Sequence, residues 1–109
     1  MPSATIARGN ILEHAILSIK LSPASVANAT SAEQTFAVRG LRTTDFIDIS
    51  KPTSQAGLAV VNARVSAKDV LAITFMNCTA ATITPTANEF YSMIIKRPEN
   101  PNSLPSENL

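Results

Sequence analysis

Short β-prone segments separated by turn residues constrain this chain more than any other feature of the sequence. Residues 17–21 (LSIKL) alternate apolar and polar side chains, as a half-buried strand does, and Ser22-Pro23 then ends the segment. Residues 70–77 (VLAITFMN) form a nearly continuous apolar run, which is typical of a strand covered on both faces. We therefore expect an all-β chain, with a strand from about Leu12 to Leu21 and residues 70–77 as its central strand.

Other segments repeat this character along the chain. They cover residues 34–39, 45–50, 58–65, 79–86 and 89–96. Residues 66–69 (SAKD) have the composition of a tight connection, whereas residues 24–33 fit either a loop or an edge strand. Turn residues recur about every eight to twelve positions, a spacing typical of sandwich folds. The pattern predicts a single β-sandwich, Ig-like or jelly-roll-like, of about seven or eight short strands.

The two ends of the chain lack this pattern. We expect residues 1–10 to be an N-terminal arm, residues 11–97 the sandwich domain, and residues 98–109 an extended or disordered, proline-rich tail. The arm combines an apolar side chain, a cation and a flexible glycine, so it can lie extended along another subunit. The predicted partner-binding residues are therefore Ile6, Arg8, Gly9 and Asn10.

Composition points to self-association. The chain is rich in Ala, Ser and Thr, but it has only four Phe, one Tyr and no Trp. We expect a thin core of small and β-branched side chains, in which Phe36, Phe46, Phe75 and Phe90 are buried. Such a core must offset an ordering cost of about 1 to 2 kcal/mol per residue, so contacts with further copies of the chain are expected to contribute.

Charge and hydropathy argue against several partners. The net charge is +1 and the basic residues are not clustered, so nucleic acid is not expected as the main partner. The N-terminus lacks the apolar segment of a signal peptide, and no apolar run approaches the ~20 residues that would span a bilayer. We therefore expect neither export by that route nor a membrane location.

The residues that usually carry chemistry are sparse. His14 is the only histidine and is expected to be an ordinary strand residue, while Cys78 is the only cysteine and is expected to fill a small apolar space. Asp45 and Asp48 lie three positions apart, an odd spacing, so on one strand they would face opposite ways and are expected to be solvated or to cap turns. We predict no catalytic residue, no cofactor and no metal, and hence no enzyme.

Three segments resemble a known family. They read GLRTTDFIDISKP, AGLAVVNARVSAKDVLAITFMNCTA and TPTANEFYSMIIKR, and they fall within residues 38–97. The recurring marks are turn and strand residues, with Gly40-Leu41, Asp45, Pro52, Gly57-Leu58, Ala63-Arg64-Val65, Asp69, Asn77 and Pro85 as they stand here. The pattern resembles the capsid decoration, or cement, proteins of tailed bacteriophages and the related β-sandwich modules of head fibres.

The resemblance implies a structural role. Proteins of this kind are non-enzymatic, assemble commonly as trimers, and bind the major capsid protein on the outer surface of the virion after synthesis in the host cytoplasm. The alternative is a receptor- or glycan-binding module of a head or tail fibre. Such a module usually displays clustered Trp and Tyr, whereas this chain has no Trp and only Tyr91. We therefore expect decoration rather than glycan binding.

Overall fold

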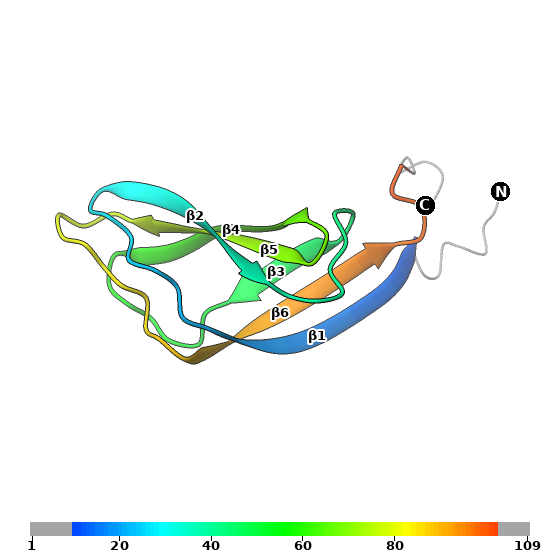
Figure 1. The fold of residues 1–109 in the computed structure, drawn as a ribbon, viewed down its shortest axis with the longest axis horizontal. Coiled ribbons are helices and arrows are strands. Elements are labelled where there is room, and N and C mark those ends of the chain that lie inside the picture. Colours follow the sequence, from blue (N-terminus) through cyan, green and yellow to red (C-terminus); the bar gives the residue numbers. More distant parts are fainter. Residues whose placement is uncertain (1–9, 103–109) are drawn as a thin grey trace.

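The computed structural model describes residues 10–102, and these form six strands and no helix (Figure 1). Strands β1 (Ile11–Leu21), β6 (Glu89–Pro98) and β3 (Phe46–Ser50) make one antiparallel sheet, in that order. Strands β2 (Thr30–Ala37), β5 (Val70–Asn77) and β4 (Leu58–Ala67) make the other. The expectation of an all-β chain is confirmed, and β5 is the central strand of its sheet as predicted.

The strand number differs from the prediction of seven or eight. Residues 79–86 do not form a strand; their one pairing is an isolated bridge between Ile83 and Val26. The Asn77 side chain forms hydrogen bonds with backbone groups of this segment: its Nδ2 donates to Ala81 O, and its Oδ1 accepts from Thr79 N. Backbone groups paired in this way are not available for a ladder.

Segment 24–33, for which a loop and an edge strand were both considered, is partly each. Its last four residues open β2, which starts at Thr30. Before that point the Gln34 side chain pairs with both backbone groups of Ala24, at 2.7 and 2.8 Å, much as a neighbouring strand would. The predicted connection at residues 66–69 is shorter than expected, because β4 runs through Ala67 and leaves Lys68 and Asp69 as the turn.

One apolar core joins the two sheets. Its buried side chains come from β6 of the first sheet and β5 of the second, among other elements, and they are Leu21, Val26, Leu41, Val65, Leu71, Ile73, Phe75, Tyr91, Met93 and Ile95. The expected core of small and β-branched side chains is therefore half right, because Val26, Val65, Ile73 and Ile95 are β-branched core residues but small residues are scarce among them. Ala72 is the one alanine among the buried apolar residues of the described part, and the sheet interior is filled by large aliphatic and aromatic side chains.

The two ends of the described chain are tied together. Asn10 Nδ2 donates to Asn100 O at 2.7 Å, Asn100 N donates to Asn10 Oδ1 at 2.8 Å, and Glu99 N donates to Asn10 O at 3.1 Å. Strand β6 thus extends to Pro98, one residue into the predicted tail. Ile6, Arg8 and Gly9 of the predicted arm lie outside the described residues, as does the tail beyond Asn102.

Candidate functional site

The outward side of the β1–β6–β3 sheet carries an unusual concentration of exposed apolar side chains. Strand alternation places Phe90, Ser92, Ile94 and Lys96 of β6 on this side, and the β-pairing sets residues of β1 and β3 beside them. Ile16 lies next to Ile94, which lies next to Asp48, and His14, Lys96 and Phe46 form the adjacent row. We call this surface, made of His14, Ile16, Ser18, Lys20, Phe46, Asp48, Ser50, Phe90, Ser92, Ile94 and Lys96, the outer face.

The exposure of its large side chains is high. Ile16 is 74% exposed, Phe46 69% and Phe90 60%. The prediction that all four phenylalanines are buried is therefore wrong for Phe46 and Phe90, whereas Phe75 is buried and Phe36 packs partly against the core. Large apolar groups gathered on one surface mark interaction sites more often than isolated ones do.

The charges on the outer face are mainly positive. Lys20 and Lys96 oppose a single aspartate, Asp48, and Lys20 Nζ lies 5.9 Å from the centre of the Phe90 ring. At this distance the ammonium is attracted by the negative face of the aromatic ring. The arrangement suits a partner surface that combines apolar side chains with carboxylates.

Near the end of β6, alternation points Arg97 to the inward side of the sheet, beside a buried carboxylate. Arg97 Nε and Nη2 donate to Asp45 Oδ1 and Oδ2 at 2.8 and 2.9 Å, and Nη2 also donates to Gly40 O at 2.9 Å. Arg97 Nη1 reaches Glu13 Oε1 at 3.3 Å. These bonds fasten the loop before β3 to both long strands of the sheet, so the cluster fixes the shape of the outer face from behind.

The Asp45 side chain is fully buried, and its environment favours the charged form. The hydrogen bonds from Arg97, with a smaller contribution from the backbone N–H of Arg42, hold the pKa of Asp45 below its ordinary value of 3.8. The expectation for Asp45 is half right: it caps the turn by accepting from Arg42 N at 3.0 Å, but it is not solvated. Asp48 is exposed, as expected.

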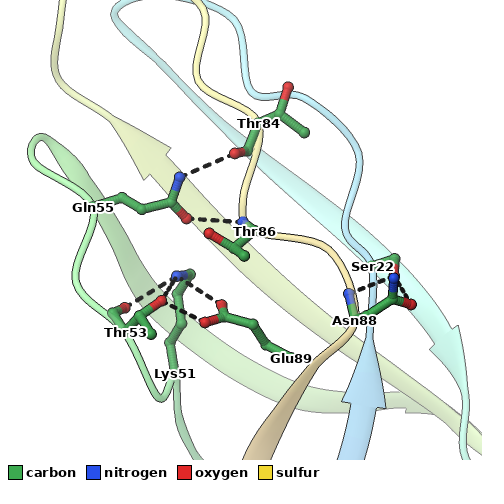
Figure 2. A network of polar contacts seen from close by, with 8 residues as sticks. All are labelled: Ser22, Lys51, Thr53, Gln55, Thr84, Thr86, Asn88 and Glu89. Atoms are coloured by element: carbon green, nitrogen blue, oxygen red, sulfur yellow. Dashed lines mark hydrogen bonds and ion pairs between the residues drawn. The ribbon is translucent and has the colours of Figure 1, made fainter.

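A second polar network joins the loops at the opposite end of the first sheet (Figure 2). Lys51 Nζ lies 3.0 Å from Glu89 Oε1, and Thr53 Oγ1 donates to Glu89 Oε2 at 2.5 Å. The bond from Thr53 and the ammonium of Lys51 together hold the pKa of Glu89 below its ordinary value. Nearby, Gln55 bridges Thr84 O and Thr86 N, and Ser22 Oγ accepts from Asn88 N.

This network is structural in character. Each of its contacts ties the β3–β4 loop or the end of β1 to the segment that leads into β6. The Lys51 and Glu89 side chains are each only 10% exposed, so the pair is largely removed from solvent. The pair therefore holds the first residues of β6, including Phe90 of the outer face, in a fixed position.

Tyr91 is fully buried in the core, and its hydroxyl makes no hydrogen bond with any described residue. Burial, with a contribution from the negative charge of Glu89, raises the pKa of Tyr91 to about 12. Tyr91 therefore offers no exposed ring for a sugar.

Replacing Tyr91 with phenylalanine is expected to raise the free energy of unfolding by about 1 kcal/mol, because the ring stays while an unpaired hydroxyl leaves the core. Urea denaturation of the two proteins measures the difference. A loss of stability in the variant would instead show that the hydroxyl has a partner, such as a buried water.

Residues that usually carry chemistry are dispersed. His14 is an exposed residue of β1, as expected, whereas Cys78 is exposed rather than filling an apolar space. The expectation for Cys78 is wrong because Asn77 is the inward residue at the end of β5, and alternation turns its neighbour outward. Within residues 10–102, no three His, Cys, Asp or Glu side chains gather as a set of metal ligands.

Of the predicted partner-binding residues, the structure describes only Asn10, whose side chain is engaged with Asn100. The outer face was not predicted, although the sequence carried a signal for it. Phe46 shares its alternation with Asp48 and Ser50, and Phe90 shares its own with Ser92 and Lys96, so polar neighbours at every second position mark both rings as outward.

Comparison with known proteins adds no relative. No protein-family model, curated protein or solved structure matches the chain significantly. The described residues contain no helix that is long and apolar enough to cross a membrane.

Proposed function

We propose that this protein is a bacteriophage capsid decoration protein. In this proposal a single β-sandwich, with the two sheets as its layers, binds the major capsid protein as a homo-oligomer on the outer surface of the virion and stabilises the shell. The protein is made in the host cytoplasm and acts by binding rather than by catalysis. The observation that carries the proposal is the outer face, on which Ile16, Phe46 and Phe90 are all more than half exposed.

Two properties of the outer face support a protein partner. Backbone ladders join β6 to β1 on one side and to β3 on the other, so the apolar side chains of the outer face need little further ordering on binding. The groups lie in rows, with Ile16 and Ile94 across from Asp48, and Lys96 between His14 and Phe46. A surface of aromatic and aliphatic anchors among polar groups is typical of the central part of a protein–protein interface.

The second candidate is a receptor- or glycan-binding module of a head or tail fibre. Phe46 and Phe90 favour it, because exposed rings stack on the apolar side of a sugar. The nearby hydrogen-bonding groups that would orient a sugar are Ser50, Ser92 and Asp48. Decoration remains the better supported of the two, since the exposed Ile16 and the half-buried Ile94 give the face an aliphatic part that suits a protein.

Cosedimentation with capsids of the phage that encodes the chain tests the proposal. We expect the wild-type protein to bind, and Phe90→Ser to weaken binding by at least about tenfold, because an aromatic hot-spot residue is typically worth about 2 kcal/mol or more. Met76→Ser is the matched control, since Met76 is a 45% exposed apolar residue on the other sheet. Circular dichroism verifies that both variants are folded.

Three outcomes separate the candidates. Absence of wild-type binding to capsids contradicts decoration, and equal binding by both variants contradicts the role of the outer face. Binding to glycans that Phe90→Ser abolishes supports the fibre module instead. A chain shortened by residues 1–9 tests the predicted arm separately, and it keeps Asn10 and its bonds to Asn100.

A further inference from the structure

Within residues 10–102, strand β1 is a sheet edge with no strand on its other side. It pairs with β6 on one side only and lies along one margin of the molecule (Figure 1). Of the four edge strands in the described part it is the longest, with 11 residues against 8 in β2, 5 in β3 and 10 in β4. Its one irregularity lies between Ile11 and Glu13, so the ladder to β6 is regular from Glu13 to Leu21. Native proteins usually blunt such an edge with a bulge, a proline or inward-pointing charges. In β1 these devices are confined to its first residues, at the Ile11–Glu13 irregularity and at the inward-facing Glu13, and residues 14–19 have none of them.

The other edges have such protection. Strand β4 is interrupted by two register shifts, and β3 and β4 lie against one another, so each partly covers the other's edge. Strand β2 carries Ser31, Glu33 and Thr35 on its outward side. Strand β1, by contrast, exposes Leu12 at 49%, Ile16 at 74% and Leu17 at 45%.

The exposure of Leu17 is informative, because this residue points to the inward side of its sheet. Alternation puts Leu17 on the same side as Ile19 and Ala15, opposite to Ile16. A groove runs beside it, lined by the apolar Ala15, Leu17, Val38, Leu41 and Ile95 and by Glu13, Arg39, Gly40 and Arg97. The edge therefore has an exposed apolar side chain on each of its sides, and a partner strand placed there would cover Ile16 on one side and Leu17 on the other.

We propose that two copies of this chain associate through antiparallel pairing of their β1 strands, related by a two-fold axis that passes between the two Ile16 residues. This contact describes how the homo-oligomer of the proposed function is built. It rests on the oligomerisation in that proposal and not on capsid binding. In this register Ile16 faces Ile16 of the second copy, and Ala15 faces Leu17. His14 then faces Ser18, and Leu12 faces Lys20, so no like charges are opposed.

The register follows from the side chains. A slip of one strand by a single residue would place the outer face of one copy beside the inward side of the other, so only slips by an even number of residues are allowed. Each such slip of two residues moves the two-fold axis by one residue. With the axis at Leu17, Ile16 would face Ser18 and the two basic residues His14 and Lys20 would be opposed. With the axis at Ala15, Ile16 would face His14; Glu13 faces an apolar residue in both registers, Leu17 here and Ile19 with the axis at Ile16. The axis at Ile16 alone continues the Ile94–Ile16 row from one copy into the next.

The occupant is a second copy because the edge complements itself. Apolar Ile16 has polar His14 and Ser18 at equal distances on either side, with apolar Ala15 and Leu17 between, so the polarity of residues 14–18 is the same in both directions of the strand. A two-fold contact closes after two copies, whereas the resemblance described above implies a trimer. The molar mass in solution therefore distinguishes the two arrangements.

Light scattering of the full chain at micromolar concentration is the first measurement. We expect a molar mass twice the 11.5 kDa of one chain. Ile16→Lys should raise the dissociation constant of the dimer by at least about tenfold, because it removes an apolar pair and opposes two like charges. Val61→Lys is the matched control, since Val61 is a 52% exposed apolar residue on β4, and it should remain dimeric.

A disulfide test fixes the register. In a Cys78→Ser background, Ile16→Cys should cross-link two chains under mild oxidation, because directly opposed residues lie about 4.5 to 5.5 Å apart between Cα atoms, within the range of a disulfide. Ser18→Cys should not cross-link, since the two copies of this position are separated by roughly 13 Å along the strands.

Four results overturn the proposal: a monomer at all concentrations, a trimer, a dimer that Ile16→Lys leaves intact while folded, or a cross-link at position 18 in place of position 16. Failure here is distinguishable from failure of the proposed function. A monomer or trimer that binds capsids refutes the β1 contact and retains decoration, whereas a cross-linked dimer that ignores capsids refutes decoration and retains the contact.

Discussion

Replacing Arg97 with alanine is expected to lower the free energy of unfolding by about 3 to 5 kcal/mol, because it leaves the fully buried carboxylate of Asp45 without its partner. The change also removes the bonds from Arg97 to Gly40 O and to Glu13. Since a domain of this size is stabilised by only about 5 to 15 kcal/mol, the variant should be close to unfolding at room temperature. Urea denaturation monitored by circular dichroism measures the change.

Arg64→Ala is the matched control for Arg97→Ala. Arg64 also makes a two-pronged pair, with Glu33 at 2.8 and 2.9 Å, but both partners lie at the surface. Solvent screens an exposed pair, so we expect only a small change. Equal losses in the two variants would contradict the argument that burial of Asp45 makes its pair important.

The pH dependence gives Arg97→Ala a second readout. The pKa of Asp45 lies below its ordinary value of 3.8, so the stabilisation from this carboxylate is present above pH 3.8 and is lost as the pH falls through the lowered pKa. In Arg97→Ala the buried carboxylate has lost its cation, and acid relieves the variant by protonating it. The difference in stability between the two proteins should therefore be largest near neutral pH and shrink in acid.

Asn77→Ala is expected to lower the free energy of unfolding by about 3 kcal/mol, because the buried amide makes four hydrogen bonds at the end of β5. Asn77 Nδ2 donates to Val26 O at 3.0 Å and to Ala81 O at 2.8 Å, and Oδ1 accepts from the backbone N–H and the hydroxyl of Thr79. Without the amide, the segment after β5 loses its attachment to the core. Thermal unfolding and urea denaturation both measure the loss.

Asn62→Ala is the control for the second prediction. Asn62 lies on the neighbouring strand β4 and is exposed, so its replacement should change stability by less than about 0.5 kcal/mol. Asn77→Asp separates hydrogen bonding from shape, since it keeps the acceptor but removes both donors and adds a buried charge. A mild effect of Asn77→Asp would mean that the amide is not anchored through its donors.

Much of the strand pattern could be predicted from local sequence. The apolar run of β5 predicted a central strand, and β5 is the middle strand of its sheet; the expected cover on both faces is incomplete, because Met76 on the outward face is 45% exposed. Ser22-Pro23 ends β1, and Gly57 precedes β4 with a φ of 82°. The seventh strand was overpredicted because residues 79–86 are β-prone, yet their backbone groups bond the Asn77 side chain. Strand propensity takes no account of a side chain that competes with a neighbouring strand for the same backbone hydrogen-bonding groups.

Burial was harder to predict than secondary structure. Composition suggested a core of small and β-branched residues. The core does contain Val and Ile, but it also contains Tyr91, Phe75, Met93 and Leu side chains, while most of the small residues lie outside it. The exposed Phe46 and Phe90 were detectable from their polar neighbours at alternate positions. Hydrophobicity of a single residue says less about its burial than the face of the strand on which it lies.

The sequence by itself determined that this chain is made of β-strands and where most of them begin and end, because alternation and turn chemistry act between residues that are close along the chain. The tertiary structure alone decided the features on which function depends. It brought Asp45 to Arg97 across 52 positions, aligned Ile16 with Ile94 on the outer face, and left β1 at an open edge. Each of these requires the order of strands in the sheets, which is set by packing between distant segments and leaves no local mark in the sequence.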